Sequence, residues 1–315
     1  MNPKLKIKLL LYRFFSTYLG KASLELLSFG VNAKNLGSRY YYGIRNLLRI
    51  FHKHKIKTTF FLSTNCFSAK GKEHNLIKME INNIIKNNHE IGLHLHPDSD
   101  LALQERLGEK FDATSAFLYS YQKKFKIIKS SRELIRRHLG KTIEGKLISF
   151  RWGNWALDSD GAKALNKLGF KIDSSATPGI KGHTNDAMRY DWSKVKRHYP
   201  WKLSIKGYQA TNHDNSNILE IPIATFDFFG FKLRADPVNS VLLNKAFEKY
   251  YKKADRSEKP FIFVVITHSS EATTKDGKPT QALKDLEDFI NFAKKFPDIK
   301  FVTMKEAYSI TNKGW

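Results

Sequence analysis

The sequence has only one cysteine, Cys66, in 315 residues. A single thiol can form neither an internal disulfide bond nor a cysteine-based zinc site, so neither device stabilises this chain. A reducing compartment is consistent with this cysteine content. The sequence also lacks a run of about twenty uncharged apolar residues, so we expect no transmembrane helix.

Acidic residues are scarce as well. The chain has 30 Asp and Glu against 54 Lys and Arg, which gives a net charge of +24. This excess predicts an anionic partner, namely nucleic acid, an acidic membrane surface or a phosphorylated substrate. Because the basic residues are spread along the chain, a lysine-rich solvated surface explains them equally well. No helix-turn-helix, aromatic-basic RNA motif or zinc module is present, so we do not expect a nucleic-acid partner.

Residues 1–20 form a basic amphipathic segment in which three lysines precede an apolar stretch. Arg13 interrupts that stretch, and no convincing cleavage site follows, whereas a signal peptide needs both an unbroken apolar core and such a site. We therefore predict a cytoplasmic protein. Two interpretations of the segment remain open: a helix lying peripherally on the inner membrane face, or an ordinary packed N-terminal helix.

Apolar runs typical of buried strands alternate with helical patterns along most of the chain. Strands are expected at Leu24–Val31, Thr58–Ser63, Glu90–Leu95, Leu147–Arg151, Phe170–Asp173, Ile218–Ile223, Phe261–Thr267 and Lys300–Thr303. Helices are expected at Tyr41–His54, Leu76–Lys86, Leu103–His138, Ser159–Leu168, Val238–Lys253 and Gln281–Lys295, with more than one helix in Leu103–His138. This alternation predicts an α/β fold with a parallel sheet, and about eight strands favour closure into a barrel. We predict one domain over residues 21–315, with an insertion near residues 177–217.

Two histidines stand one residue apart at the end of the third expected strand, followed by Pro97. Residues i and i+2 of a strand point to the same face, so His94 and His96 are expected to project side by side. Two imidazoles on a rigid strand end suit a divalent metal. Polar residues also close other expected strands, among them Arg151 and His268. Since the carboxyl ends of barrel strands meet at one rim, we predict the site there.

The motifs resemble those of the polysaccharide deacetylase (NodB-type) family, from about Leu24 to Tyr308. The segments that carry the resemblance are Lys57–Leu62, His94–Pro97, Phe150–Trp155, Leu168–Ser175 and Thr267–Ser269. The His-Leu-His-Pro run looks like a variant of the family's second motif. The resemblance implies a distorted (β/α) barrel of about seven to eight strands. It also implies metal-dependent hydrolysis of N-acetyl or other N-acyl groups on a cell-surface glycan or lipid-linked sugar precursor.

The resemblance further implies a role for particular residues. His94, His96 and Asn32 match the metal ligands, and zinc is the expected divalent ion. The catalytic residues that it implies are His268 as general acid, Asp173 as the carboxylate that orients His268, and Arg151 as the residue that orients the base. Trp152 or Trp155 would wall the sugar pocket.

The sequence departs from the family at the first motif. Gly30 stands where the general base belongs, and Asn32 stands where a metal-binding aspartate belongs. An amide oxygen can bind a metal, but it lacks the negative charge of a carboxylate. Either Asp98, Asp100 or Asp173 replaces the missing acid, or the pocket is retained in a catalytically inactive carbohydrate-binding relative.

Overall fold

The computed structural model describes residues 37–111, 116–183, 188–211, 216–236, 240–254, 261–297 and 299–312. Several predictions fall outside these residues: the basic segment 1–20, the strand at Leu24–Val31, and the first-motif positions Gly30 and Asn32.

A six-stranded sheet with strand order β1-β2-β3-β4-β8-β7 forms the centre of the molecule. Its strands are β1 (Thr59–Ser63), β2 (Glu90–Leu95), β3 (Ser149–Trp152), β4 (Ile172–Asp173), β7 (Trp201–Lys202) and β8 (Leu219–Glu220). Pairing is parallel from β1 through β8, and only β7 runs antiparallel. Five of these strands coincide with predicted apolar runs, because parallel strands are covered on both faces and are therefore apolar throughout. Leu93, Phe150 and Ile172, from three neighbouring strands, are completely buried.

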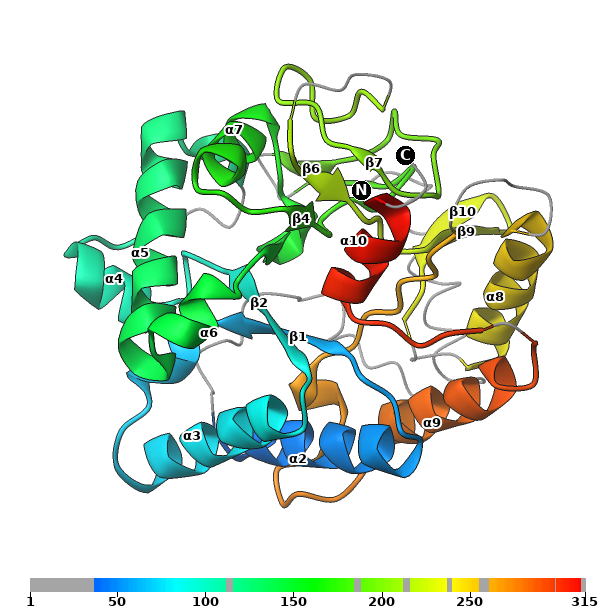
Figure 1. Ribbon diagram of the computed structural model, residues 1–315, viewed down its shortest axis with the longest axis horizontal. Coiled ribbons are helices and arrows are strands. Elements are labelled where there is room, and N and C mark those ends of the chain that lie inside the picture. The colour runs from blue at the N-terminus through cyan, green and yellow to red at the C-terminus, as the bar shows by residue number, and fades with distance from the viewer. Residues whose placement is uncertain are drawn as a thin grey trace, which may run out of the picture.

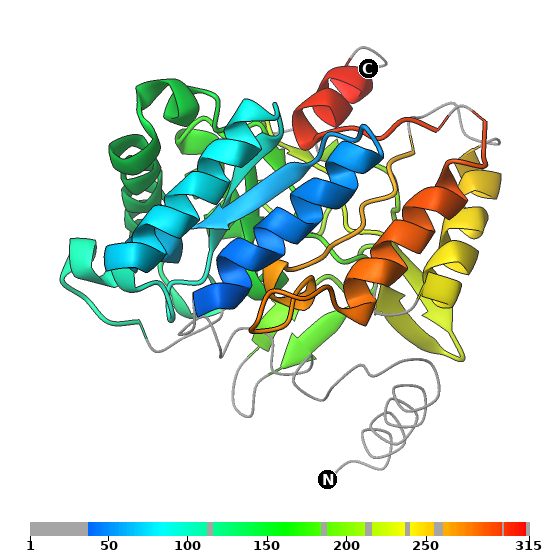
Figure 2. The same cartoon turned by 90° about the horizontal axis from the view of Figure 1, so that it is seen from below.

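Helices surround this sheet (Figures 1 and 2). They are α2 (Gly37–Lys53), α3 (Gly71–Lys86), α4 (Leu101–Leu107), α5 (Tyr121–Leu139), α6 (Lys141–Gly145), α7 (Ser159–Lys167), α8 (Ser240–Ala254), α9 (Gln281–Ala293) and α10 (Met304–Asn312). Short 3-10 turns are η2 (Thr64–Ser68), η3 (Ala116–Leu118), η4 (Gly153–Trp155) and η5 (Ser269–Glu271). Helices α2 and α3 lie beside β1, while α8 and α9 lie together on another side. Side-chain oxygens of Asp100, Ser120, Asp158 and Thr280 cap α4, α5, α7 and α9, which satisfies backbone donors at each helix start.

The predicted closure into a barrel is not confirmed. The apolar run Phe261–Thr267 forms a single parallel bridge, from Val264 to Ile223, instead of a strand. Its other backbone bonds go to irregular segments, for example from the Ile266 N–H to the Ala235 carbonyl. The run Lys300–Thr303 forms no described strand either, and the Thr303 N–H bonds the Glu306 carboxylate at the start of α10. Both segments are apolar enough for strands, but their backbones bond to other groups.

Two small antiparallel hairpins accompany the sheet. One pairs β5 (Lys181–His183) with β6 (Met188–Asp191), within the region predicted as an insertion. The other pairs β9 (Thr225–Phe228) with β10 (Phe231–Arg234). The prediction of one domain with an insertion near residues 177–217 stays a prediction.

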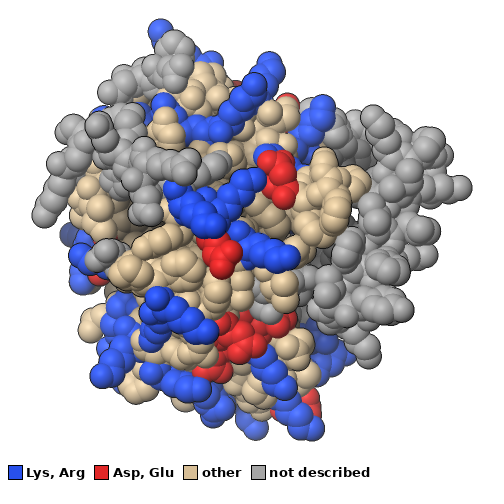
Figure 3. Space-filling model, turned by 90° about the vertical axis from the view of Figure 1, so that its right-hand side faces the viewer, with Lys and Arg blue, Asp and Glu red and all other residues tan. Residues whose placement is uncertain are grey.

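The surface is basic on the side that α8 and α9 occupy, where Lys and Arg cover more of the face than Asp and Glu (Figure 3). Within the part of the chain that the structure describes, no helix is both long and apolar enough to cross a membrane.

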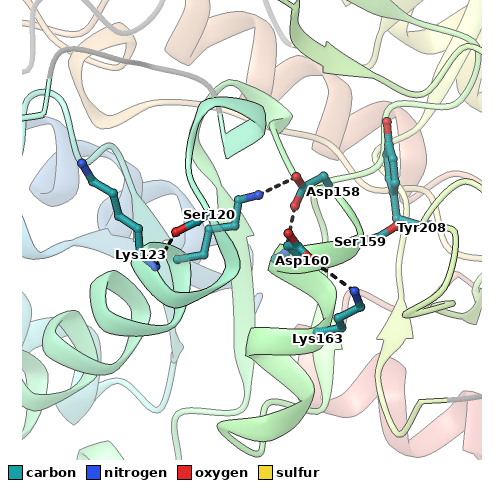
Figure 4. Close-up of polar contacts among 9 residues, drawn as sticks. Ser120, Lys123, Asp158, Ser159, Asp160, Lys163 and Tyr208 are labelled. Carbon is teal, nitrogen blue, oxygen red and sulfur yellow. Dashed lines mark hydrogen bonds and ion pairs between the residues drawn. The ribbon is translucent and has the colours of Figure 1, made fainter.

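A buried ion pair joins α5 to the start of α7. The Lys124 ammonium lies 2.5 Å from the Asp158 carboxylate, and the Lys124 side chain is only 1% exposed. Asp158 also accepts a hydrogen bond from the Gly161 N–H as the α7 cap (Figure 4). Asp160, two residues after Asp158, forms a second ion pair with Lys163 at 3.1 Å. The side chain of Asp160 is 39% exposed and that of Lys163 is 48% exposed. Two chemically similar pairs thus differ mainly in burial.

This difference predicts unequal effects of charge removal. Asp158→Asn keeps the helix cap but leaves the Lys124 charge buried without its partner, which should lower the free energy of unfolding by about 3 kcal/mol. Asp160→Asn, the exposed control, should lower it by less than about 1 kcal/mol. Urea denaturation of both variants measures these values, and equal losses would contradict the argument from burial.

Candidate active site

His94 and His96 lie at the carboxyl end of β2, as predicted from their spacing. Their ring centroids are 4.8 Å apart, and both side chains are half-buried. His94 is paired in register with Ser63 of β1 and with Arg151 of β3. Three strand ends therefore meet around this histidine pair.

The hydrogen bonds indicate which imidazole nitrogens are available. His94 Nδ1 lies 2.9 Å from the carbonyl oxygen of Arg151, and since a carbonyl only accepts, Nδ1 must carry the proton. The Nε2 lone pair of His94 is then left for a ligand. His96 Nδ1 is buried and has no hydrogen-bond partner among the described residues. Gly153 lies against it, because a Cβ there would come within 2.6 Å of this nitrogen.

Both imidazoles are neutral at pH 7. Burial lowers the pKa of His94 well below its usual value, and the nearby His96 lowers it further. Burial, together with the charge of His268, lowers the pKa of His96 to about 4. Neutral imidazole is the form that binds a metal.

Arg151 is half-buried beside two carboxyl groups. Its guanidinium donates to the carbonyl and the hydroxyl of Ser174, both at 2.9 Å, and stacks 4.2 Å over the Phe61 ring. Burial lowers the pKa of Arg151 to about 10, although the charges of Asp173 and Glu220 act in the opposite direction. Arg151 therefore stays positive at neutral pH.

Asp173 and Glu220 face each other in register on β4 and β8. Asp173 accepts from the Ser175 N–H at 3.0 Å and from its hydroxyl at 2.8 Å, while Glu220 accepts from the Ala176 N–H. Both carboxyl groups are completely buried. Burial and the adjacent Asp173 raise the pKa of Glu220 well above its usual range. We infer that Glu220 is protonated and shares its proton with Asp173.

His268 is paired with a different carboxylate from the one predicted. Its Nδ1 lies 3.0 Å from Glu271 Oε1, and the His268 N–H donates to the other oxygen of Glu271. Burial lowers the pKa of His268, but Glu271 outweighs this effect, so that the pKa lies above its usual value. The hydrogen bonds described for Asp173 go to Ser175, and its carboxyl neighbour is Glu220, so no described bond supports the predicted pairing of Asp173 with His268.

The two tryptophans differ in exposure. Trp152 has no exposed surface and packs edge-on against Phe150, so of the two predicted tryptophans only Trp155 is left to wall a sugar pocket in this conformation. Trp155 is 9% exposed and carries the Arg234 guanidinium 3.8 Å over its ring. Its backbone φ of 55° is unusual for a bulky residue. This strained position marks Trp155 as the better candidate for a ligand contact.

Asp100 and Asp173, two of the three carboxylates that could replace the missing first-motif acid, have other roles. Asp100 caps α4 and accepts a hydrogen bond from the Thr64 hydroxyl, and burial raises its pKa to about 6. Asp173 is enclosed by Ser175 and Glu220. Both carboxyl groups are therefore already engaged by neighbouring groups.

The donor set fits part of a metal site. Two neutral nitrogens, one of them buried without a partner, match the preference of zinc for imidazole. The carbonyl behind His94 is the kind of group that orients metal-binding histidines. Among the described residues, no group of three His, Cys, Asp or Glu side chains could hold a metal ion. A third ligand would come from elsewhere, and the predicted one, Asn32, lies outside the described residues.

Sequence reasoning missed three contributors. The sequence does contain a sign of Glu220, because this residue is a lone carboxylate inside the apolar run Ile218–Ile223. It also contains a sign of Glu271, because this residue follows His268 by three residues, a spacing that one helical turn brings together. Gly153 could be understood only from the packing against His96.

Comparison with known proteins supports the resemblance. Residues 41–172 match the family model of polysaccharide deacetylase. The matched part is less than half of the chain, and it contains the histidine pair. No curated protein matches the chain in sequence.

Three solved structures share the fold of this chain. A provisionally named polysaccharide deacetylase from Mycobacterium smegmatis is 17% identical, with a TM-score of 0.54 over 86% of this chain and 77% of that one. Another from Pseudomonas aeruginosa PAO1 is 12% identical, with a TM-score of 0.51 over 85% and 71%. A provisionally named glycoside hydrolase/deacetylase from Parabacteroides distasonis is 14% identical, with a TM-score of 0.65 over 87% and 64%.

The packing around His96 predicts a large effect of one methyl group. In Gly153→Ala the new Cβ would collide with His96 Nδ1 and, closer still, with the Leu95 carbonyl oxygen. We expect a loss of about 1–3 kcal/mol in stability and at least a roughly tenfold loss in zinc affinity. Urea denaturation and calorimetric zinc titration measure the two effects. Gly145→Ala, where the methyl group meets nothing within 4 Å, should change neither.

The pKa of His268 should depend on Glu271. In the unaltered protein it should lie above 6.5, and in Glu271→Gln it should fall, because burial then acts without the opposing charge. An NMR titration of the imidazole protons measures it. Glu287→Gln removes the carboxylate beside His54 instead and should leave His268 unaffected. A pKa that Glu271→Gln leaves unchanged would refute the role of the pair.

Proposed function

We propose that this protein is a metal-dependent hydrolase that removes N-acetyl or other N-acyl groups from a sugar. The substrate would be a cell-surface glycan or a lipid-linked sugar precursor. The observation that carries the proposal is the pair of neutral, half-buried imidazoles, His94 and His96, at the strand edge where the family match lies. The deacetylases that share the fold suggest the substrate class.

Each residue would have a separate task. His94 Nε2 and His96 would hold the metal, expected to be zinc, which when bound polarises an amide carbonyl and a water molecule. Glu271 keeps His268 protonated to a higher pH, so that His268 could give a proton to the departing amine. Arg151 fixes the loop at Ser174 and supplies a half-buried positive charge beside the site. Trp155 would contact the apolar face of the sugar.

A second candidate is a carbohydrate-binding relative that no longer catalyses the reaction. Gly30 and Asn32 favour it, since they replace the base and an anionic ligand of the family's first motif. Loss of a positioned base alone costs roughly 10²–10⁴ in rate. We further propose that the protein works in the cytoplasm at the inner membrane face, where its basic surface would meet anionic lipids or a phosphate-linked substrate.

Zinc titration coupled to acetate release from N-acetylated sugars separates the two candidates. If the first motif is the only defect, Gly30→Asp with Asn32→Asp should raise both zinc affinity and acetate release, the latter by about 10²–10⁴. His94→Ala in the same background should abolish the gain. Asn35→Asp, which adds one acid in the same segment, serves as the charge control.

The outcomes are distinct. Zinc-dependent acetate release by the unaltered chain would establish the hydrolase and exclude the inactive relative. Sugar binding with no acetate release from either form would instead support the carbohydrate-binding relative.

A further inference from the structure

The β9–β10 hairpin has an unusual turn. Two residues, Phe229 and Gly230, connect its strands, with φ angles of 45° and 76°. Positive φ at both positions is the pattern of a type I′ turn, which Asn-Gly and Gly-Gly prefer. A phenylalanine in this conformation is sterically strained. The turn therefore holds a bulky ring where backbone stability would favour asparagine or glycine.

The Phe229 ring points into solvent. Its side chain is 80% exposed, more than that of any other large apolar residue found exposed in the described part of the chain. Among the described residues, its one ring contact is an edge-on one with Phe228, at 4.7 Å between centroids. Neither core packing nor the backbone thus explains this residue, and strain kept at an exposed position is a sign of function.

The β9–β10 hairpin has an apolar face next to the turn that carries Phe229. The strand register places Phe231 opposite Phe228 and Leu233 opposite Phe226, so that all four side chains share a face. All four are half-buried. Phe226, Phe231 and Leu233 lie outside the hydrophobic clusters that the buried described residues form. The hairpin thus ends in an apolar edge.

Positive charge surrounds this edge. Lys232 lies 2.7 Å from Asp227, and its hydrogen bond lowers the pKa of Asp227, with further contributions from Lys249 and His198. Lys249 and Lys245 are exposed on α8, the helix on the side of the molecule that Figure 3 shows to be basic. Aromatic rings beside lysines are typical of segments that enter the headgroup region of a membrane.

We propose that the β9–β10 hairpin inserts Phe229 and the edge of its apolar face into the headgroup region of an anionic lipid bilayer. A second copy of this chain would bring a like charge of +24, whereas anionic lipid complements the lysines. At the other end of the hairpin, Arg234 stacks over Trp155 at the candidate site. About four residues, or roughly 13 Å of strand, separate the tip from that stacking contact. Insertion would therefore hold the site near the membrane, which deepens the proposed function and rests on its membrane location.

The test uses a substitution that separates stability from membrane binding. Phe229→Asn creates the Asn-Gly turn, so it should raise the melting temperature while lowering affinity for vesicles of equal parts phosphatidylglycerol and phosphatidylcholine by about tenfold. The control is Leu118→Asn, at an exposed leucine elsewhere on the surface that is 55% accessible. This change should leave vesicle binding unchanged. Co-sedimentation of the full chain and thermal unfolding measure the two properties.

Weak binding of the unaltered chain to pure phosphatidylcholine vesicles would support the role of the lysines. Unchanged vesicle binding by Phe229→Asn, or no binding of the unaltered chain to the anionic vesicles, would overturn the proposal. So would a lower melting temperature, because the ring would then stabilise the fold. A dimer that Phe229→Asn alone dissociates, with vesicle binding unaltered, would assign the hairpin to self-association instead. No acetylated sugar enters these measurements, so this proposal and the hydrolase can fail separately.

Discussion

The hydrogen bond between His94 Nδ1 and the Arg151 carbonyl links the pairing of β2 and β3 to the chemistry of the site. It exists only in the observed register, and a shift of one residue would turn His94 to the other face of the sheet. The buried side chains of Leu93 and Leu95 hold that register, because the same shift would turn them away from the core positions that they fill. The tautomer of one imidazole thus depends on the packing of the sheet core.

Burial determines the protonation states around this bond. The same desolvation that keeps His94 and His96 neutral also lowers the pKa of Arg151 and raises that of Glu220. If Asp173 and Glu220 were both ionised beside Arg151, three charges would be poorly solvated. When the two carboxyl groups share one proton, only one negative charge remains to pair with Arg151. The remaining Arg151–Asp173 charges are satisfied largely by serines, which contribute hydrogen bonds without further charge.

Much of the fold could be predicted from the sequence, because a parallel sheet buries whole apolar runs and β2 matches its run at both ends. The prediction failed at Phe261–Thr267, since apolarity reports burial but not whether the backbone finds a pairing partner. The histidine pair followed from strand periodicity alone. The partner of His268 could not be predicted in this way. His268 is bonded by Glu271, a carboxylate only three residues away, and not by an acid at the end of another strand. Hydrophobic periodicity in the sequence does not predict contacts within turns of only a few residues.

Charge balance explains why the first-motif positions matter so much. In the described part of the site, Arg151 is offset by the Asp173–Glu220 pair and His268 by Glu271, so these groups are close to neutral together. A divalent ion held by two neutral imidazoles would add two uncompensated positive charges in a poorly solvated place. The family's two first-motif acids would cancel them, but Gly30 and Asn32 cannot. The same missing anions would have served as metal ligand and as base. Under the proposed function, metal affinity and catalysis would therefore be coupled, because both would depend on negative charge at the same two positions of the sequence.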